Sequence, residues 1–279
     1  MLLNKKLKIL VTNQKGGVGK SSLSANLAAY FAIEKEQQTV LVDFDRQATS
    51  SQWVVHAKPH PKLRAESVSQ VIHGGNRLSL FGARSTIRDA ASKADVVITD
   101  ITWSPVIGPD ILDVFDLVLV PTSLSELELL STIGLLRDLR MGLTKAGAPK
   151  LVLCPNKVHP FQRKFNAMAA QRFPVPFLLA PPITQSKEFE LHYQKDFIIR
   201  AAEADVQAKF RQFCQAIEQA AAFVPNALSA NAKPTAAAPA TEAMRVLHER
   251  TQNAPANSPV VQPAVEEIPS IIRAKPANF

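Results

Sequence analysis

Short runs of apolar residues recur through the first 223 positions of the chain, and polar residues do not alternate with them. Such runs are typical of β-strands that are covered on both faces of a sheet. Each run is followed by polar residues, which marks its end. The pattern predicts strands at residues 7–12, 39–43, 95–100, 116–121, 150–155 and 175–179.

The segments between the runs carry a helical spacing of apolar residues. The first of them places Leu23, Leu27 and Phe31 on one helix face. Strands that alternate with helices predict an α/β fold, with a doubly wound, mostly parallel sheet flanked by helices. Ligands of such sheets bind beyond the carboxyl ends of the strands. Helices are predicted at residues 21–35, 125–145 and 201–222.

The composition changes near Val224. Residues 224–279 are rich in Ala and Pro and contain no Gly, and they carry too few large apolar side chains to offset the entropy lost on ordering. The sequence therefore predicts a folded domain at residues 1–223 and a disordered, flexible tail at residues 224–279. Two patches, residues 241–250 and 268–272, leave open the alternative that part of the tail orders on a partner.

Charge and cysteine content narrow the classes of protein. Lys plus Arg is 32 and Asp plus Glu is 24, a formal net charge of +8, which favours an anionic partner such as nucleic acid or acidic membrane. Two cysteines, Cys154 and Cys214, are too few for a disulfide-dense scaffold or a four-cysteine zinc site. No apolar run reaches membrane-spanning length and no signal peptide pattern begins the chain, so we expect a cytoplasmic protein.

A glycine-rich segment, residues 13–22, joins the first predicted strand to the first predicted helix. This context suits a phosphate-binding loop, because glycines let backbone N–H groups and a helix N-terminus face phosphate oxygens. Lys20 is then expected to reach the β- and γ-phosphates of a nucleotide and Ser21 to bind Mg²⁺. The strict pattern has Gly where this chain has Gln14, and a second lysine, Lys15, suggests contact with another subunit's nucleotide. The predicted nucleotide-binding residues of the loop are Lys15, Gly16, Gly17, Val18, Gly19, Lys20, Ser21 and Ser22.

Carboxylates follow two of the predicted strands. Asp43 and Asp45 are two residues apart, so they lie on the same side of the pleat. One is expected to support the Mg²⁺ ion and the other to orient the attacking water. Asp100, at the end of another strand, is a predicted further ligand of the ion. Each carboxylate alone is also consistent with a helix N-cap.

With these motifs the chain resembles the ParA/MinD family of deviant Walker-A ATPases over roughly residues 7–215. Lys15-Gly-Gly-Val-Gly-Lys-Ser-Ser matches the family's signature. Asp43-Phe-Asp-Arg-Gln is similar to its second motif, with Arg46 where proline is usual. Asp100 matches the Walker B aspartate, although Ile-Thr-Trp-Ser-Pro follows where the family often has prolines.

The resemblance implies a homodimer that encloses ATP and Mg²⁺. Lys15 of one subunit is expected to contact the phosphates of the other, Lys20, Ser21 and Asp100 to hold phosphate and metal, and Asp45 to position water. The resemblance thus implies the catalytic residues Lys15, Lys20, Asp45 and Asp43 and the metal-binding residues Ser21, Asp43 and Asp100. Asn156 is expected to bind adenine, and Pro182 or its neighbour Pro181 to pack on it. Hydrolysis to ADP and phosphate would be weak and partner-stimulated, and it would release the dimer.

Members of the family differ in what the dimer binds. Neither Cys154 nor Cys214 lies in the switch loop directly after Asp100, so an iron–sulfur bridge is excluded. The final residues do not form a basic amphipathic helix, so membrane binding is disfavoured. The basic surplus favours DNA bound without sequence preference. The candidate DNA-binding residues are Lys187, Lys195, Arg200, Lys209 and Arg211, with residues 163–172 and 58–93 as alternative basic segments.

The main hypothesis is a short plasmid-partition ATPase that associates with the nucleoid and works with a centromere-binding partition protein. Two alternatives stay open. One is a positioning ATPase for a cargo other than DNA, with the tail as adaptor. The other is a metabolic P-loop enzyme whose turnover a small molecule stimulates.

Overall fold

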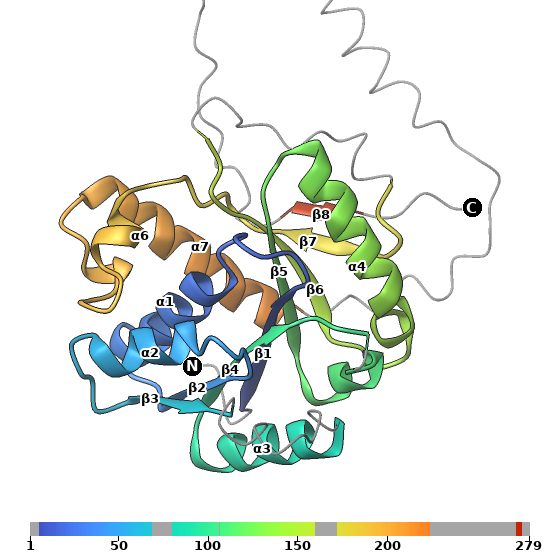
Figure 1. The fold of residues 1–279 in the computed structure, drawn as a ribbon, viewed down its shortest axis with the longest axis horizontal. Helices are drawn as coiled ribbons and strands as arrows, with labels where there is room; N and C mark the ends of the chain where they lie inside the picture. The colour runs from blue at the N-terminus through green and yellow to red at the C-terminus, as the bar shows by residue number, and fades with distance from the viewer. Residues whose placement is uncertain (1–5, 69–79, 106, 160–171, 224–271, 275–279) are drawn as a thin grey trace, which may run out of the picture. The chain divides into compact units, whose positions relative to one another are not determined.

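The structure is a computed structural model, and it describes residues 6–68, 80–105, 107–159, 172–223 and 272–274. Its centre is one β-sheet with the strand order β3-β2-β4-β1-β5-β6-β7-β8. The first seven strands in this order are parallel to their neighbours, and the last is antiparallel (Figure 1). The predicted α/β fold with a mostly parallel sheet is confirmed. The strands are β1 (Leu7–Asn13), β2 (Thr39–Asp43), β3 (Leu63–Ser67), β4 (Val96–Thr102), β5 (Leu117–Thr122), β6 (Lys150–Pro155), β7 (Phe177–Leu179) and β8 (Ile272–Ala274).

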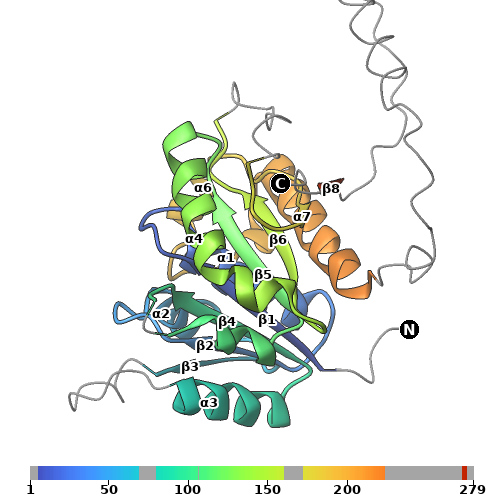
Figure 2. The same cartoon turned by 90° about the vertical axis from the view of Figure 1, so that its right-hand side faces the viewer.

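Helices cover both faces of the sheet, and this is why the strands are apolar without alternation. Figure 2 shows α4 and α7 on opposite sides of β5 and β6. The helices are α1 (Lys20–Ile33), α2 (Thr49–His56), α3 (Leu80–Lys93), α4 (Glu126–Thr144), α6 (Glu188–Leu191) and α7 (Ala204–Ala222), with 3-10 turns η2 (Pro109–Val114) and η3 (Ile198–Arg200).

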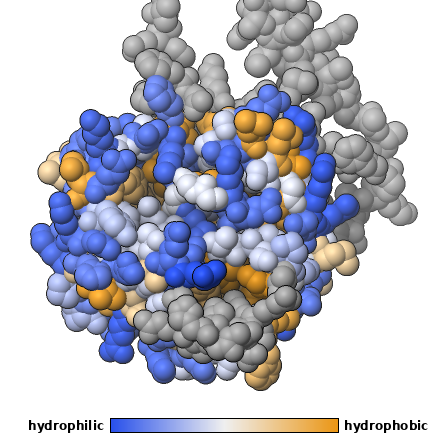
Figure 3. Space-filling model, in the orientation of Figure 1, coloured by the Kyte–Doolittle hydropathy of each residue, from blue (hydrophilic) through white to orange (hydrophobic). Residues whose placement is uncertain are grey.

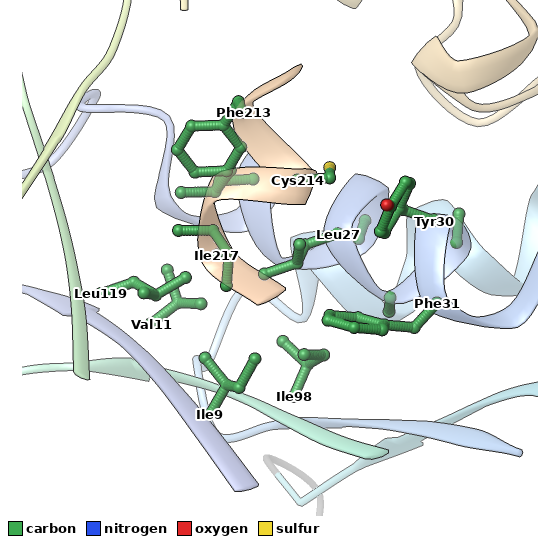
Figure 4. Packing of buried hydrophobic residues seen from close by; sticks show 14 of the residues in the cluster. Ile9, Val11, Leu27, Tyr30, Phe31, Ile98, Leu119, Phe213, Cys214 and Ile217 are labelled. Carbon is green, nitrogen blue, oxygen red and sulfur yellow. The ribbon is translucent and has the colours of Figure 1, made fainter. Parts of the chain in front are cut away.

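Two apolar clusters form the core, one on each face of the sheet. Ile9 and Val11 point to the cluster that includes side chains of α1, α2 and α7, whereas Leu10 points to the cluster that includes α3, η2 and α4. Figure 4 shows Leu27 of α1 and Ile217 of α7 packed over β1 on the first of these faces. The central strand β1 is thus held from both sides, and its carboxyl end is a fixed point for the loop that follows.

The sequence analysis did not predict several of the described elements, among them β3, α2 and α3. In β3 only Leu63 is buried, because this strand lies at the edge of the sheet and pairs with β2 alone. An edge strand needs few apolar residues, so it lacks the signal that marks the central strands. In α2 the buried positions include Ser50 and Ser51, whose polarity hides the helical pattern.

One segment of the predicted tail joins the sheet. Residues 272–274 form β8 and pair antiparallel with β7, with Leu178 opposite Arg273. The patch at residues 241–250 lies outside the described residues, and the boundary near residue 223 stays a prediction, although α7 does end at Ala222. Among the helices that the structure describes, none is long and apolar enough to cross a membrane.

The fold predicts that alanine substitution at two glycines of α4, Gly142 and Gly134, will affect the stability of the protein differently. A Cβ atom on Gly142 would lie 2.7 Å from the Pro109 carbonyl oxygen and 2.8 Å from Leu112 Cδ1, so Gly142→Ala should destabilise the protein by about 1–2 kcal/mol despite the better helix propensity of alanine. A Cβ on Gly134 meets only the Gln14 amide nitrogen, at 3.8 Å.

Gly134→Ala is therefore the matched control in the same helix and should be neutral or stabilise by up to about 1 kcal/mol. Urea unfolding of the three proteins gives the comparison. Equal stability of the two variants would show that α4 does not pack this closely on η2.

Candidate nucleotide-binding site

The loop between β1 and α1 has the backbone geometry of a phosphate-binding loop. Gly17 and Gly19 adopt positive φ angles of 81° and 86°, a conformation that side chains with a Cβ rarely adopt. Asn13, at the end of β1, supports the turn, since its Oδ1 accepts a hydrogen bond from the Lys15 amide at 3.0 Å and its Nδ2 donates to the Pro121 carbonyl at 2.8 Å. The loop is thereby attached to both β1 and β5.

Asn156 braces the other side of the loop. Its Nδ2 donates to the Val18 carbonyl at 2.8 Å, and its backbone N–H donates to the Thr122 carbonyl. A Cβ on Gly19 would lie 2.2 Å from the Asn156 amide nitrogen, so only glycine allows this approach. The predicted contact of Asn156 with adenine stays a prediction; in this structure its amide group holds the loop.

The ammonium group of Lys20 lies between two carboxylates. Its Nζ is 2.9 Å from Asp100 Oδ1 and 3.3 Å from Asp45 Oδ2. Lys20 is 8% exposed and Asp100 is fully buried. Burial acts to lower the pKa of Lys20, but the attraction of Asp100 and Asp45 outweighs it and raises the pKa. Lys20 is therefore held as a cation at the carboxyl ends of β1 and β4.

One buried carboxylate oxygen at this edge of the sheet is left without a hydrogen bond by the described residues. Asp100 Oδ2 is buried and makes no hydrogen bond among the residues that the structure describes. An unsatisfied buried oxygen of this kind is costly unless a cation or a water completes its surroundings. Ser21 is the second residue of α1 and directly follows Lys20. The binding of Mg²⁺ by Ser21 and Asp100 stays a prediction, since the described residues contain no cluster of three or more His, Cys, Asp or Glu side chains that could hold a metal without phosphate and water.

Asp43 makes contacts of a different kind. Its Oδ2 accepts hydrogen bonds from the Ser50 hydroxyl at 2.7 Å and the Ser51 amide at 2.9 Å, and its Oδ1 accepts from the Asp45 amide. Asp43 thus fastens the first turn of α2 to the end of β2. Its predicted part in catalysis and metal binding stays a prediction, and these hydrogen bonds favour a supporting role.

Asp45 is held by its neighbours in an ionised form. Its Oδ2 accepts from the Thr102 hydroxyl at 2.6 Å, and its Oδ1 accepts from the Gln47 amide at 3.1 Å. Partial burial acts to raise the pKa of Asp45, but these hydrogen bonds and Lys20 together lower it. Sequence reasoning missed Thr102, although its position two residues after Asp100 places both on one side of β4.

Lys15 is oriented away from this charge cluster. Its Nζ lies 3.5 Å from Glu128 Oε1, and its side chain is 39% exposed. Glu128 is in the first turn of α4, where its Oε2 also accepts from the Ser123 amide. Hydrogen bonds from Ser123 and Lys15 lower the pKa of Glu128 although burial opposes them. Sequence reasoning missed Glu128, but the Ser125-x-x-Glu128 spacing is a known signal of a helix N-terminus.

A cavity of about 300 Å³ opens beside the loop. Trp53 of α2 and Tyr193, just after α6, meet edge to face there with ring centroids 5.2 Å apart. Pro182 is exposed and is not among the lining residues, so its packing on a base stays a prediction, whereas the adjacent Ile183 does line the cavity. The lining residues are Gly19, Ser22, Leu23, Trp53, Asn156, Lys157, Ile183, Thr184, Gln185, Ser186, Phe189, Glu190 and Tyr193.

The candidate DNA-binding residues fall into two groups. Arg200, Lys209 and Arg211 each form an ion pair with a carboxylate, namely Asp196, Asp205 and Glu34. Lys187 and Lys195 are exposed, and their ammonium groups form no ion pair within the described part of the chain. The surface in Figure 3 is largely hydrophilic, with apolar side chains gathered in a few patches.

The loop geometry predicts that alanine substitution destabilises the protein at Gly19 but not at Gly16. Gly19→Ala should destabilise the nucleotide-free protein by about 1–2 kcal/mol or more, because a left-handed backbone is unfavourable for alanine and the new Cβ displaces Asn156. A Cβ on Gly16 meets nothing within 4 Å, so Gly16→Ala should stay within about 0.5 kcal/mol of the unaltered chain. Chemical unfolding without nucleotide measures both, and equal losses would contradict the bracing role of Asn156.

Solved structures with this fold include nucleotide complexes. An ATP complex of a Cyanothece McdA variant superposes with a TM-score of 0.61 at 13% identity, covering 80% of this chain and 99% of that one. An AMPPNP-bound Borrelia burgdorferi protein, named as a plasmid partition protein, gives 0.60 at 14% identity over 77% and 99%. The cobyrinic acid a,c-diamide synthase of Mycobacterium smegmatis with an ATP analogue and magnesium gives 0.57 at 19% over 77% and 94%. At these identities the likeness shows the fold.

Sequence comparison gives the family. An uncharacterized protein of Borreliella burgdorferi is 48% identical to this chain over 50 residues. The match covers 18% of this chain and 20% of the length of that relative. The model of the CobQ/CobB/MinD/ParA nucleotide binding domain matches residues 9–196, a span that runs from β1 to Asp196 and includes the glycine loop, the three aspartates and Asn156. The chain therefore belongs to the CobQ/CobB/MinD/ParA nucleotide-binding family.

Proposed function

We propose that this protein is an ATP-dependent dimerising ATPase that binds DNA without sequence preference and takes part in plasmid or DNA partition. The observation that carries the proposal is the division between the two loop lysines. Lys20 is buried in the carboxylate cluster, whereas Lys15 is partly exposed on the outer side of the same loop. We assign Lys20 to a phosphate bound in cis, and Lys15, which is paired with Glu128 at the surface, to a phosphate of a second subunit.

ATP fits the site in charge and in shape. The positive-φ glycines and the N-terminus of α1 form the proposed phosphate cradle. The adjacent cavity of about 300 Å³ combines apolar and aromatic side chains, which suit a base, with polar ones. Ser21 and Asp100 are the proposed partners of Mg²⁺, which when bound neutralises charge on the phosphates. Asp45 is the proposed residue that orients the attacking water, because it is ionised and lies at the same strand edge.

A second copy of the chain is the proposed partner in the ATP state. Leu127 and Leu130, on either side of Glu128 in α4, are 77% and 43% exposed. Their apolar surface and the Lys15 side chain lie on the same end of the molecule, because Lys15 reaches Glu128. In a dimer that buries this end, Lys15 leaves Glu128 for the phosphates of the other subunit, and hydrolysis of ATP reverses the exchange.

Substitution of the two lysines should separate these roles. Lys20→Ala should abolish ATP binding, because it removes the cation that faces the phosphates and leaves Asp100 buried without a partner. Lys15→Ala should leave ATP binding by the monomer within a few-fold of normal while reducing dimerisation and turnover at least ten-fold.

Binding of a fluorescent ATP analogue, sedimentation of the ATP-bound protein and phosphate release measure the three properties. Lys62→Ala, which breaks an exposed ion pair with Glu36, is the control and should change none of them. Equal loss of nucleotide binding from the two loop variants would refute the division of labour.

DNA is the proposed anionic partner, because the chain carries a net charge of +8. The proposal also includes a centromere-binding partner protein that stimulates the hydrolysis of ATP. The fold neighbours include a protein named for plasmid partition, which supports this choice. Among the residues that the structure describes, Lys187 and Lys195 are the two candidates whose exposed ammonium groups form no ion pair. They are therefore the first candidates for phosphate contacts, ahead of Arg200, Lys209 and Arg211, which would have to leave a carboxylate.

The DNA proposal predicts a steep salt dependence that involves these two lysines. Lys187→Ala/Lys195→Ala should weaken ATP-dependent binding to DNA of any sequence and reduce the slope of log K against log salt by about 2. The control is Lys8→Ala/Lys62→Ala, which makes the same charge change at ion-paired lysines near the amino ends of β1 and β3. Fluorescence anisotropy over a salt series measures the slopes, and identical slopes for both double variants would reject Lys187 and Lys195 as contacts.

A metabolic ATP-dependent enzyme is the second candidate function. It is favoured by the fold likeness to cobyrinic acid a,c-diamide synthase, whose structure holds an ATP analogue and magnesium. The two functions differ in what stimulates ATP turnover. DNA and a partner protein should stimulate a partition ATPase, whereas a small-molecule acid should stimulate a metabolic enzyme.

A further inference from the structure

Thr102 connects the two acidic loops of the site. It is the last residue of β4, and its hydroxyl donates to Asp45 Oδ2 at 2.6 Å. The register of the sheet explains the meeting, because β2 and β4 are neighbours with Asp43 opposite Asp100. The Phe44 N–H donates to the Asp100 carbonyl and so continues the pairing beyond Asp43. Asp45 and Thr102 follow two residues after Asp43 and Asp100, respectively, so they come to lie opposite each other.

The Thr102 hydroxyl is the nearer of two side-chain donors to the Asp45 carboxylate. Asp45 lies beyond the end of β2, and its Oδ2 has two partners, Thr102 and Lys20, of which Lys20 is the more distant at 3.3 Å. When Lys20 turns to a phosphate group, Thr102 remains as the side-chain donor to that oxygen. The Gln47 amide continues to hold Oδ1 at 3.1 Å.

We propose that Thr102 is a positioning residue for the hydrolysis of ATP, whose hydroxyl holds the Asp45 carboxylate toward the attacking water once Lys20 has engaged the phosphates. The inference rests on the proposed function and adds to it a residue outside the nucleotide-binding motifs.

The frame around Thr102 is rigid enough for such a role. The next residue, Trp103, is 4% exposed, and its backbone N–H donates to the Asn13 carbonyl at 3.3 Å. The end of β4 is therefore attached to the end of β1 immediately before the glycine loop. The Thr102 side chain itself is exposed, and Asp45 is its one hydrogen-bond partner among the described residues, so its removal leaves the core unchanged.

The test compares Thr102→Val, which keeps the shape and loses the hydroxyl, with Thr102→Ser, which keeps the hydroxyl. Thr102→Val should lower kcat about ten-fold, the order expected for one hydrogen bond to a charged group, while KM for ATP, the affinity for a non-hydrolysable analogue and the thermal unfolding midpoint stay close to those of the unaltered chain. Thr102→Ser should restore kcat to within about three-fold of that of the unaltered chain.

The same valine substitution in an Asp45→Asn background shows whether Thr102 acts through Asp45. The double variant should turn over ATP at the rate of Asp45→Asn alone, since the carboxylate that Thr102 positions is gone. An unchanged kcat in Thr102→Val, or an equal further loss in the Asn background, would overturn the positioning role while leaving the proposed function intact. Absence of ATP turnover in the unaltered chain with DNA present would overturn both.

Discussion

The ion cluster of Lys20, Asp100 and Asp45 is the interaction on which the rest of the site depends. A buried ammonium group is stable only beside carboxylates, and a fully buried Asp100 is stable only beside a cation. Each partner therefore fixes the other at the carboxyl ends of β1 and β4. A nucleotide phosphate is also an anion, so it can take the place of a carboxylate beside Lys20 without leaving the ammonium group unpaired.

The sheet brings these groups together through its register. The strand order puts β1 between β4 and β5, and the parallel pairing aligns Asp43 with Asp100 at the same edge. The glycine loop then leaves β1 and is braced from β5 by Asn13 and from β6 by Asn156. Because apolar clusters cover both faces of the sheet, its carboxyl edge is where polar side chains and backbone groups remain available to a ligand.

The charges of the molecule are more balanced locally than the total suggests. The chain has a net charge of +8, yet three of the five candidate DNA-binding residues form ion pairs, and Lys15 forms one with Glu128. Exposed ion pairs of this kind contribute little to stability and exchange partners easily. They let a basic side chain change from an internal carboxylate to an external phosphate when the partner arrives.

Much of this protein was determined by local sequence. The six apolar strands, the three long helices, the glycine loop with Lys15 and Lys20, and the family resemblance all follow from patterns within a few residues, because periodicity and backbone requirements are local properties. Local patterns do not predict the edge strand β3, the short helix α2 or the pairing of β8 with β7. Their stability comes from neighbours distant in the chain, such as Asp43 for α2 and β7 for β8.

Tertiary structure alone decided which side chains meet. Lys15 with Glu128, Thr102 with Asp45 and Trp53 with Tyr193 are each separated by more than fifty residues in the sequence, and no local pattern specifies such pairs. Strand order and register bring them together, and both are set by the packing of helices on the two faces of the sheet. The chemical groups of the site can thus be read from the chain, but their division into phosphate-facing, supporting and partner-facing roles depends on the fold.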